Sequence, residues 1–218
     1  MTHAPAVLVL MAVLAYLIGS ISFAVWVSHW MGLPDPHSYG SGNPGATNVL
    51  RTGNRKAAIW TLLGDAGKGV LAVALAAVTA TLHQQGMAGL ALVGLAAFVG
   101  HLFPIWHRFQ GGKGVATAAG VLLMLQPWMG LATVLTWLTT ALVFRYSSLA
   151  ALAAAFVAPG FAYFFHRGWD LVLGVSLMSA LLVLRHRPNI VKLLRGEESK
   201  IGQGAKSKIG QGAKSKIG

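Results

Sequence analysis

Long apolar runs separated by short polar segments are the dominant pattern of this chain. A helix of about 20 apolar residues, with about 17–25 as the usual range, crosses the hydrocarbon core of a membrane. The pattern predicts spans near residues 5–28, 57–82, 87–106, 114–127, 128–144, 149–165 and 169–184. Because proline breaks the helical hydrogen-bond ladder, Pro127 makes 114–144 either two helices or one kinked helix. The predicted fold is all-α and polytopic, with about seven transmembrane helices and five or six as alternatives.

The composition supports membrane embedding. Of the 218 residues, 55% are hydrophobic and only 10% are charged, against about 25% charged residues in soluble domains. A soluble class is therefore excluded. Residues 1–198 are predicted to form a single transmembrane domain. The tail at 199–218 repeats SKIGQGAK and has few large apolar residues, which predicts a disordered basic segment; a role at the membrane surface is the less favoured alternative.

The basic residues indicate how the protein sits in the membrane. They number 17 against 5 acidic residues, and they gather at 29–56, 107–113 and 145–148 and after the last span. Lysine and arginine favour the cytoplasmic side. With seven spans these segments share one side, so the N-terminus is predicted outside and the C-terminus in the cytoplasm. Nucleic acid is not a predicted partner, because the basic residues of such a binder would not be separated by long apolar runs.

Several chemistries are excluded by residue type. The chain has no cysteine, which excludes disulfides, thiolate catalysis and cysteine-ligated metals. Its histidines are scattered without an H-E-x-x-H pattern, and its acidic residues are too few for an oxygen cage. No G-x-S-x-G nucleophile elbow occurs. We therefore predict neither a metal nor a cofactor.

The segment Ser38–Arg55, SYGSGNPGATNVLRTGNR, is polar and rich in glycine. Small residues let backbone N–H groups approach an anion, and a helix that begins after such a loop adds its positive end. Arg51 and Arg55 can supply charge-assisted contacts to phosphate. The density of Asn, Ser and Arg favours an anion-binding loop over a plain surface loop.

A second glycine-rich segment, HRFQGGKGVAT, runs from His107 to Thr117. A Walker A loop requires a hydroxyl directly after its lysine, and Gly114 follows Lys113 here, so a P-loop NTPase is rejected. Two interpretations remain equally open. The segment is either an anion cradle at the N-terminus of the next helix or a Gly-Gly turn with an interfacial lysine.

Other polar residues are candidates with less specific signals. In RHRPNIVKLLRGEE, the basic residues read as topology anchors, whereas His186 and Asn189 can hydrogen-bond a polyol or phosphate. His186 is also a candidate general base. Asp65 and Lys68 lie three apart in an apolar run and are either a structural pair or support for the site. His101 reads as a packing or interfacial histidine, and Ser147 and Ser148 either join the site or cap a helix.

Taken together, these segments resemble the bacterial acyl-phosphate:glycerol-3-phosphate acyltransferase family (PlsY). The resemblance covers residues 8–198 and rests on GSGNPGATNVLRTG, GDAGKG, GHLFPIWHRFQGGKGVAT and RHRPNI with a following G-E. It implies transfer of a fatty acyl group from acyl phosphate to the sn-1 hydroxyl of glycerol 3-phosphate, giving lysophosphatidic acid and inorganic phosphate. It also implies the bacterial cytoplasmic (inner) membrane, membrane lipid as a partner, and a site on the cytoplasmic side. The family lacks the HX4D motif, and no histidine here has an aspartate five positions later.

The resemblance and the polar segments together assign the site residues. The predicted catalytic residues are Lys113, Ser41, Arg51 and His186. The predicted substrate-binding residues are Asn43, Gly45, Thr47, Asn48, Gly111, Gly112, Gly114, Thr117, Ser147 and Asn189. The hydroxyl proton is expected to pass to a substrate phosphate, with His186 as the alternative base. The competing functional classes are a transporter of phosphorylated solutes and a structural membrane scaffold.

Overall fold

The computed structural model describes residues 4–83 and 86–202, and every regular element in this part of the chain is helical. The elements are α1 Ala4–Gly19, α2 Phe23–Trp30, α3 Ala46–Val49, η1 Leu50–Thr52, α4 Arg55–His83, α5 Met87–Leu102, η2 Ile105–His107, α6 Val115–Leu125, α7 Pro127–Phe144, α8 Ser147–His166, α9 Trp169–Arg185 and α10 Arg187–Leu194. The prediction of an all-α fold is confirmed.

Five segments of the described chain are long and apolar enough to cross a membrane. They are Pro5–Trp30, Arg55–Thr79, Met87–His107, Pro127–Phe144 and Ser147–His166. A sixth is added if α9 and α10, which meet at 58°, are counted as one span. The predicted span at 114–127 differs most from expectation. Its helix α6 has 11 residues and extends about 16 Å, roughly half of the hydrocarbon core. The count of seven stays a prediction.

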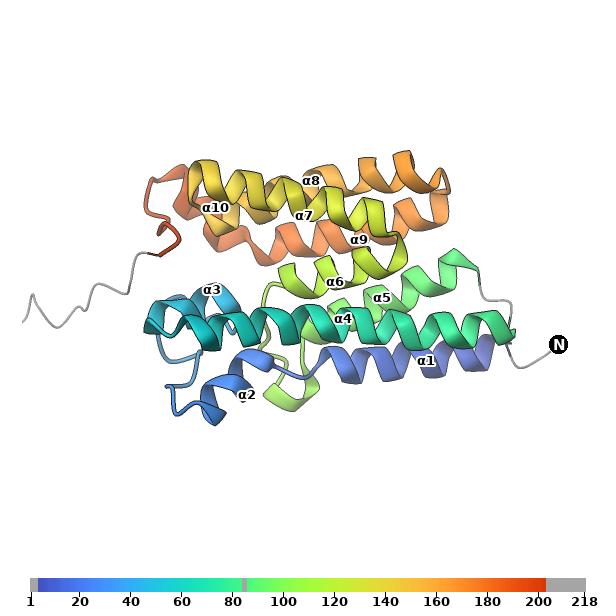
Figure 1. Ribbon diagram of the computed structural model, residues 1–218, viewed down its shortest axis with the longest axis horizontal. Coiled ribbons are helices and arrows are strands. Elements are labelled where there is room, and N and C mark those ends of the chain that lie inside the picture. Colours follow the sequence, from blue (N-terminus) through green and yellow to red (C-terminus); the bar gives the residue numbers. More distant parts are fainter. Residues whose placement is uncertain (1–3, 84–85, 203–218) are drawn as a thin grey trace, which may run out of the picture.

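The region 114–144 forms two helices, which settles the alternative left open by the sequence. Gln126 is extended and caps α7, because its side-chain oxygen accepts from the backbone N–H of Trp128 at 2.7 Å and of Met129 at 3.1 Å. Pro127 occupies the first helical position, where the missing N–H costs nothing. Helix α7 therefore turns back along α6 in an antiparallel pair (Figure 1).

Three segments that carry basic residues lie together at one end of the bundle, which we call the basic end. Figure 1 shows the α2–α4 connection, the α7–α8 connection and α10 at this end, and the N-terminal end of α1 with the α8–α9 connection at the other. The basic end therefore carries Arg51, Arg145 and Lys192. This arrangement agrees with the sidedness expected from charge.

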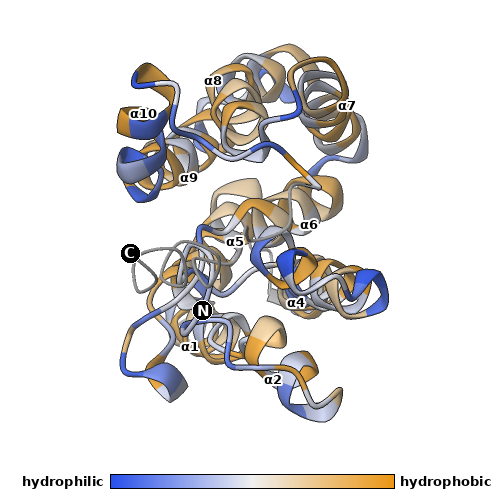
Figure 2. Ribbon diagram, turned by 90° about the vertical axis from the view of Figure 1, so that its left-hand side faces the viewer, coloured by the Kyte–Doolittle hydropathy of each residue, from blue (hydrophilic) through white to orange (hydrophobic). Residues whose placement is uncertain are grey.

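Small residues allow the helices to pack closely. A Cβ atom at Gly120 would lie 2.0 Å from the carbonyl oxygen of Ala66, and one at Gly19 would lie 2.0 Å from that of Ala97. The contacts α4–α6 and α1–α5 therefore require glycine, as is typical of helices that pack in membranes. Figure 2 shows hydrophobic residues along most of the helices and hydrophilic residues in the connections and parts of α4 and α10. Many large apolar side chains are exposed, and Phe156 is 86% exposed. Such a surface suits contact with lipid.

Candidate active site

A polar cavity of about 480 Å³ opens among the elements of the basic end. Most of the predicted site residues line it: Ser41, Asn43, Gly45, Thr47, Asn48, Arg51, Lys113, Gly114, Ser147, His186 and Asn189. These residues come from segments that lie far apart in the sequence. The fold thus brings Ser38–Arg55, His107–Thr117 and Arg185–Glu198, which we call the first, second and third polar segments, to one cavity.

The first polar segment is held in shape by Asn48. This side chain is 2% exposed; its amide nitrogen donates to the carbonyl oxygens of Pro36 at 2.8 Å and Tyr39 at 3.2 Å. Its amide oxygen accepts from the backbone N–H of Ser41 at 3.0 Å. Gly40 has a φ of +60°, and a Cβ atom there would lie 2.3 Å from the Asn48 oxygen. The amide of Asn48 is therefore used by the loop itself, which presents Ser41 at the cavity.

Lys113 meets the third polar segment through Asn189. The ammonium Nζ donates to the amide oxygen of Asn189 at 2.6 Å, and the amide nitrogen donates to a carboxylate oxygen of Glu198 at 2.7 Å. The hydroxyl of Ser148 donates to the same Glu198 oxygen at 2.7 Å. Because a carboxylate can only accept, Glu198 fixes the amide so that its oxygen faces Lys113.

Lys113 is half-buried among further cations, which affects its charge state. Burial lowers the pKa of Lys113 to about 8. The carboxylate of Glu198 opposes this shift, and the positive charges of Lys192 and Arg51 add to it. An arriving phosphate would add negative charge beside these cations and would stabilise the charged form of Lys113.

His186 lies immediately after α9 and is 2% exposed. Its Nδ1 lies 2.8 Å from the carbonyl oxygen of Leu182. A carbonyl oxygen only accepts, so Nδ1 carries the proton and the neutral ring offers Nε2 as an acceptor. Burial lowers the pKa of His186 to about 4. The neutral ring is therefore suited to accept a hydrogen bond from a hydroxyl group.

Three predicted residues, Gly111, Gly112 and Thr117, do not line the cavity, and packing explains their positions. A Cβ atom at Gly111 would lie 2.1 Å from the carbonyl oxygen of His101, and one at Gly112 would lie 2.1 Å from the His101 ring nitrogen Nε2. The Gly111 carbonyl accepts from Arg185 at 2.7 Å. Thr117 is fully buried, and its carbonyl lies against Gly69 of α4. Here glycine lets the loop pack on the end of α5.

A buried charged cluster lies beneath this loop. Lys68 Nζ lies 2.9 Å from Asp65 Oδ1, and His101 Nδ1 lies 3.5 Å from the same oxygen. Lys68 also donates to the carbonyl oxygen of Ile21, at the break between α1 and α2, at 2.6 Å. The pair therefore joins α4 to the break between α1 and α2, and it extends to His101. Asp65 and His101 also line the cavity. Among the described residues, no three His, Cys, Asp or Glu side chains form a group able to hold a metal ion.

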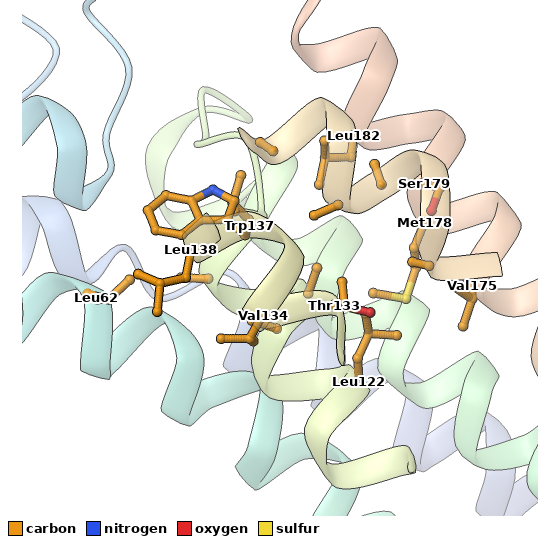
Figure 3. Close-up of a pocket in the computed structure, with 18 residues that line it drawn as sticks. Leu62, Leu122, Thr133, Val134, Trp137, Leu138, Val175, Met178, Ser179 and Leu182 are labelled. Carbon is orange, nitrogen blue, oxygen red and sulfur yellow. The ribbon is translucent and has the colours of Figure 1, made fainter. Parts of the chain in front are cut away.

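An apolar cavity of about 310 Å³ adjoins the polar one. Figure 3 shows Val134, Trp137 and Leu138 of α7 opposite Val175, Met178 and Leu182 of α9. Four residues line both cavities: Leu62, Val115, Ala116 and Trp137. The two cavities thus share a wall and combine a polar end with an apolar one.

The chain is similar to known proteins over nearly its whole length. The family model described as glycerol-3-phosphate acyltransferase matches residues 9–196. A glycerol-3-phosphate acyltransferase of Cupriavidus taiwanensis is 64% identical over 198 residues, which cover 89% of this chain and 96% of the relative. That of Ralstonia pickettii is 63% identical and covers 89% and 94%. The chain belongs to the glycerol-3-phosphate acyltransferase family.

Solved structures agree with this membership. A crystal structure of PlsY in its glycerol 3-phosphate form matches with a TM-score of 0.82 and 34% identity, covering 89% of this chain and 96% of that one. Its lysophosphatidic acid form matches with a TM-score of 0.79 and 34% identity, covering 88% and 94%. Both are described as an integral membrane glycerol 3-phosphate acyltransferase. The chain is accordingly a multi-pass membrane acyltransferase, and the transporter and scaffold alternatives are set aside.

For this glycerol-3-phosphate acyltransferase, the sequence-based prediction missed Glu198, the contact between Asp65 and His101, and the apolar cavity. Glu198 ends the segment RHRPNIVKLLRGEE, but the G-E of the family resemblance is Gly196 and Glu197, so Glu198 was not predicted as a site residue. It nevertheless contacts both Ser148 and Asn189. The link between Asp65 and His101 joins residues of different helices, so no sequence spacing signals it. The apolar cavity is lined by small and aliphatic side chains that look like ordinary span residues. Of these features, only Glu198 lies in a segment that the sequence analysis had marked as polar.

Proposed function

We propose that this enzyme takes its acyl group from acyl phosphate and transfers it to the sn-1 hydroxyl of glycerol 3-phosphate. The products are 1-acyl-glycerol 3-phosphate and inorganic phosphate. The observation that carries this proposal is the junction of the two cavities at Ala116 and Trp137. A donor with a long alkyl chain and a small charged head fits an apolar cavity that shares a wall with a cationic one.

The reaction needs no covalent enzyme intermediate. The sn-1 oxygen attacks the carbonyl carbon of the acyl phosphate, the new carbon–oxygen ester bond forms, and the bond from carbon to the bridging phosphate oxygen breaks. The hydroxyl proton passes to the departing phosphate, which leaves as hydrogen phosphate. Acyl phosphate is already activated, so the protein gains most by holding two anionic substrates together and stabilising the oxyanion.

The cations have the main role in this scheme. We assign Lys113 and Arg51 to the substrate phosphates and to the developing oxyanion, because both line the polar cavity and carry donors suited to phosphate oxygens. Ser41 and Asn43 at the first loop, with Thr47 and Ser147, supply further hydroxyl and amide groups. The Thr47 and Ser147 hydroxyls already lie 3.1 Å apart. These groups are placed to bind the polar parts of the substrates.

His186 orients the attacking hydroxyl in this scheme. Its Nε2 accepts from the sn-1 hydroxyl, and its pKa of about 4 makes it too weak a base to keep the proton at neutral pH. The substrate phosphate, with a second pKa of about 6, is the better final acceptor. This favours substrate assistance over histidine as the base.

The cytoplasmic face of the inner membrane is the proposed location of the site. The polar cavity lies at the basic end, and basic connections favour the cytoplasmic side. Glycerol 3-phosphate reaches this face from the cytosol, whereas the acyl chain arrives through the lipid. A site at the interface receives each substrate from the phase in which it dissolves.

An isotope experiment tests the proposed bond cleavage. Acyl phosphate labelled with oxygen-18 in the bridging position is supplied with unlabelled glycerol 3-phosphate to the purified protein in lipid. Attack at the carbonyl carbon places the label in inorganic phosphate and leaves the ester unlabelled. Label in the acyl product, or no turnover of acyl phosphate, contradicts the proposal.

A further inference from the structure

The tetrapeptide Ser-Lys-Ile-Gly occurs three times at the end of the sequence, at 199–202, 207–210 and 215–218. The family match ends at residue 196, so the first copy lies just outside it. This copy is within the described chain, and Ser199 and Ile201 line the polar cavity. A segment outside the family match thus reaches the candidate active site.

The first copy is held by contacts along its length. The Arg51 guanidinium donates to the Ser199 hydroxyl oxygen. The backbone N–H of Ile201 donates to the carbonyl oxygen of Arg145 at 2.7 Å, and the Lys200 ammonium lies 5.8 Å from the centre of the Tyr146 ring. The surface that receives the copy therefore consists of Arg51 on one side of the cavity mouth and the α7–α8 connection on the other.

We propose that the mouth of the polar cavity is a docking surface for the chain's own Ser-Lys-Ile-Gly segment, which competes with substrate phosphate for Arg51. The inference rests on the proposed role of Arg51 in binding phosphate. A serine hydroxyl is a single neutral acceptor, whereas a phosphate offers several charged oxygens to the guanidinium fork. The phosphate therefore displaces the segment, and the displacement weakens the apparent binding of phosphate.

Two truncated proteins separate the first copy from the rest of the tail. One ends after Glu198 and lacks every copy; the other ends after Gly202 and keeps the first copy. We expect the protein that ends after Glu198 to bind inorganic phosphate about three- to tenfold more tightly than the protein that ends after Gly202, as expected for loss of one competing hydrogen bond. Titration calorimetry measures this without acyl phosphate, so a wrong donor does not affect the result.

Point variants keep the test independent of truncation. Ser199→Ala in the full chain removes the hydroxyl that Arg51 contacts, and it should tighten phosphate binding in the same direction as the truncation. With Arg51→Gln, the two truncated proteins should bind phosphate equally, because the contact for which both ligands compete is gone. Equal affinities of the two truncated proteins with Arg51 intact overturn the docking proposal. Weaker phosphate binding after removal of the first copy also overturns it.

A different result would contradict the proposed function. If the full chain bound inorganic phosphate but did not turn over acyl phosphate, the donor assignment would be wrong while the calorimetric comparison still decided the docking. If Arg51→Gln in the full chain left phosphate affinity unchanged, the role of Arg51 in phosphate binding would be wrong, and the docking proposal would fall with it.

Discussion

The Lys113 ammonium donates to the Asn189 amide oxygen across 2.6 Å, joining the glycine-rich loop to the segment after α9. The side-chain amide of Asn189 cannot flip freely, because its nitrogen donates to Glu198 across 2.7 Å. A cation is thus held at the cavity by a neutral acceptor and not by a direct ion pair. This arrangement leaves its charge available for a phosphate.

Lys113→Ala should reduce kcat/KM by about 10²–10³, the usual cost of removing one preorganised donor from an oxyanion site. The protein should remain folded, since Lys113 is half-buried and lies in a loop. Steady-state assays and thermal unfolding measure the two quantities. Lys192→Ala is the matched control: it removes an exposed positive charge of the same segment as Asn189 and should change kcat/KM little. Comparable losses in both variants would argue against a specific role for Lys113.

The activity should fall at alkaline pH. The pKa of Lys113 is lowered by burial to about 8, so the ammonium is present below that pH and is lost as the pH rises through it. Substrate phosphates are already ionised there, because their second pKa is about 6. We therefore expect kcat/KM, measured between about pH 6.5 and about pH 9.5, to fall at high pH, and the slope of log(kcat/KM) against pH to approach −1. A profile that stays flat through pH 9 would contradict this assignment.

Glu198→Ala should lower kcat/KM by about tenfold or more, because Asn189 and Ser148 lose their common acceptor. Glu198→Gln keeps an acceptor oxygen and should recover part of the activity. It should also move the alkaline decline to lower pH, because the Glu198 charge raises the pKa of Lys113. The neighbouring Glu197 is exposed, and Glu197→Gln is the control. A merely structural Glu198 would leave the pH profile in place.

Gly112→Ala should destabilise the protein by about 1–3 kcal/mol, the usual cost of overpacking. The added Cβ atom would lie 2.1 Å from His101 Nε2 and 2.7 Å from the Pro44 carbonyl oxygen. Thermal unfolding measures the effect. Gly67→Ala places a methyl group in open space on α4 and should be neutral or slightly stabilising. Equal stability of the two variants would show that the loop relaxes away from His101.

Much of the fold could be predicted because span length and charge placement follow directly from the membrane as solvent. The short length of α6 could not be predicted. Residues 126 and 127 decide where this helix ends, and the sequence allowed either a kink or a turn there. The polar loops stood out because Asn, Ser and Arg are rare beside apolar runs. The hydrogen bonds within these loops could not be predicted from the sequence. Asn48, for example, was predicted to bind substrate, but its side chain hydrogen-bonds within its own loop.

The second glycine-rich segment shows the same limit. Gly111 and Gly112 were predicted to free backbone groups for an anion, yet their missing side chains make room for His101 and the end of α5. Sequence cannot distinguish these reasons for glycine, because both need a close backbone approach. Lys113 and Gly114, two residues further on, do line the cavity.

In the proposed reaction, acyl phosphate is the donor and its phosphate is the leaving group. The most direct measurement supplies the purified protein in lipid with glycerol 3-phosphate and either acyl phosphate, acyl-CoA or acyl carrier protein, and quantifies inorganic phosphate and lysophosphatidic acid. We expect one phosphate to be released for each lysophosphatidic acid formed from acyl phosphate, and no product from the other two donors. Lysophosphatidic acid formed from acyl-CoA or acyl carrier protein without phosphate release would contradict the proposed reaction.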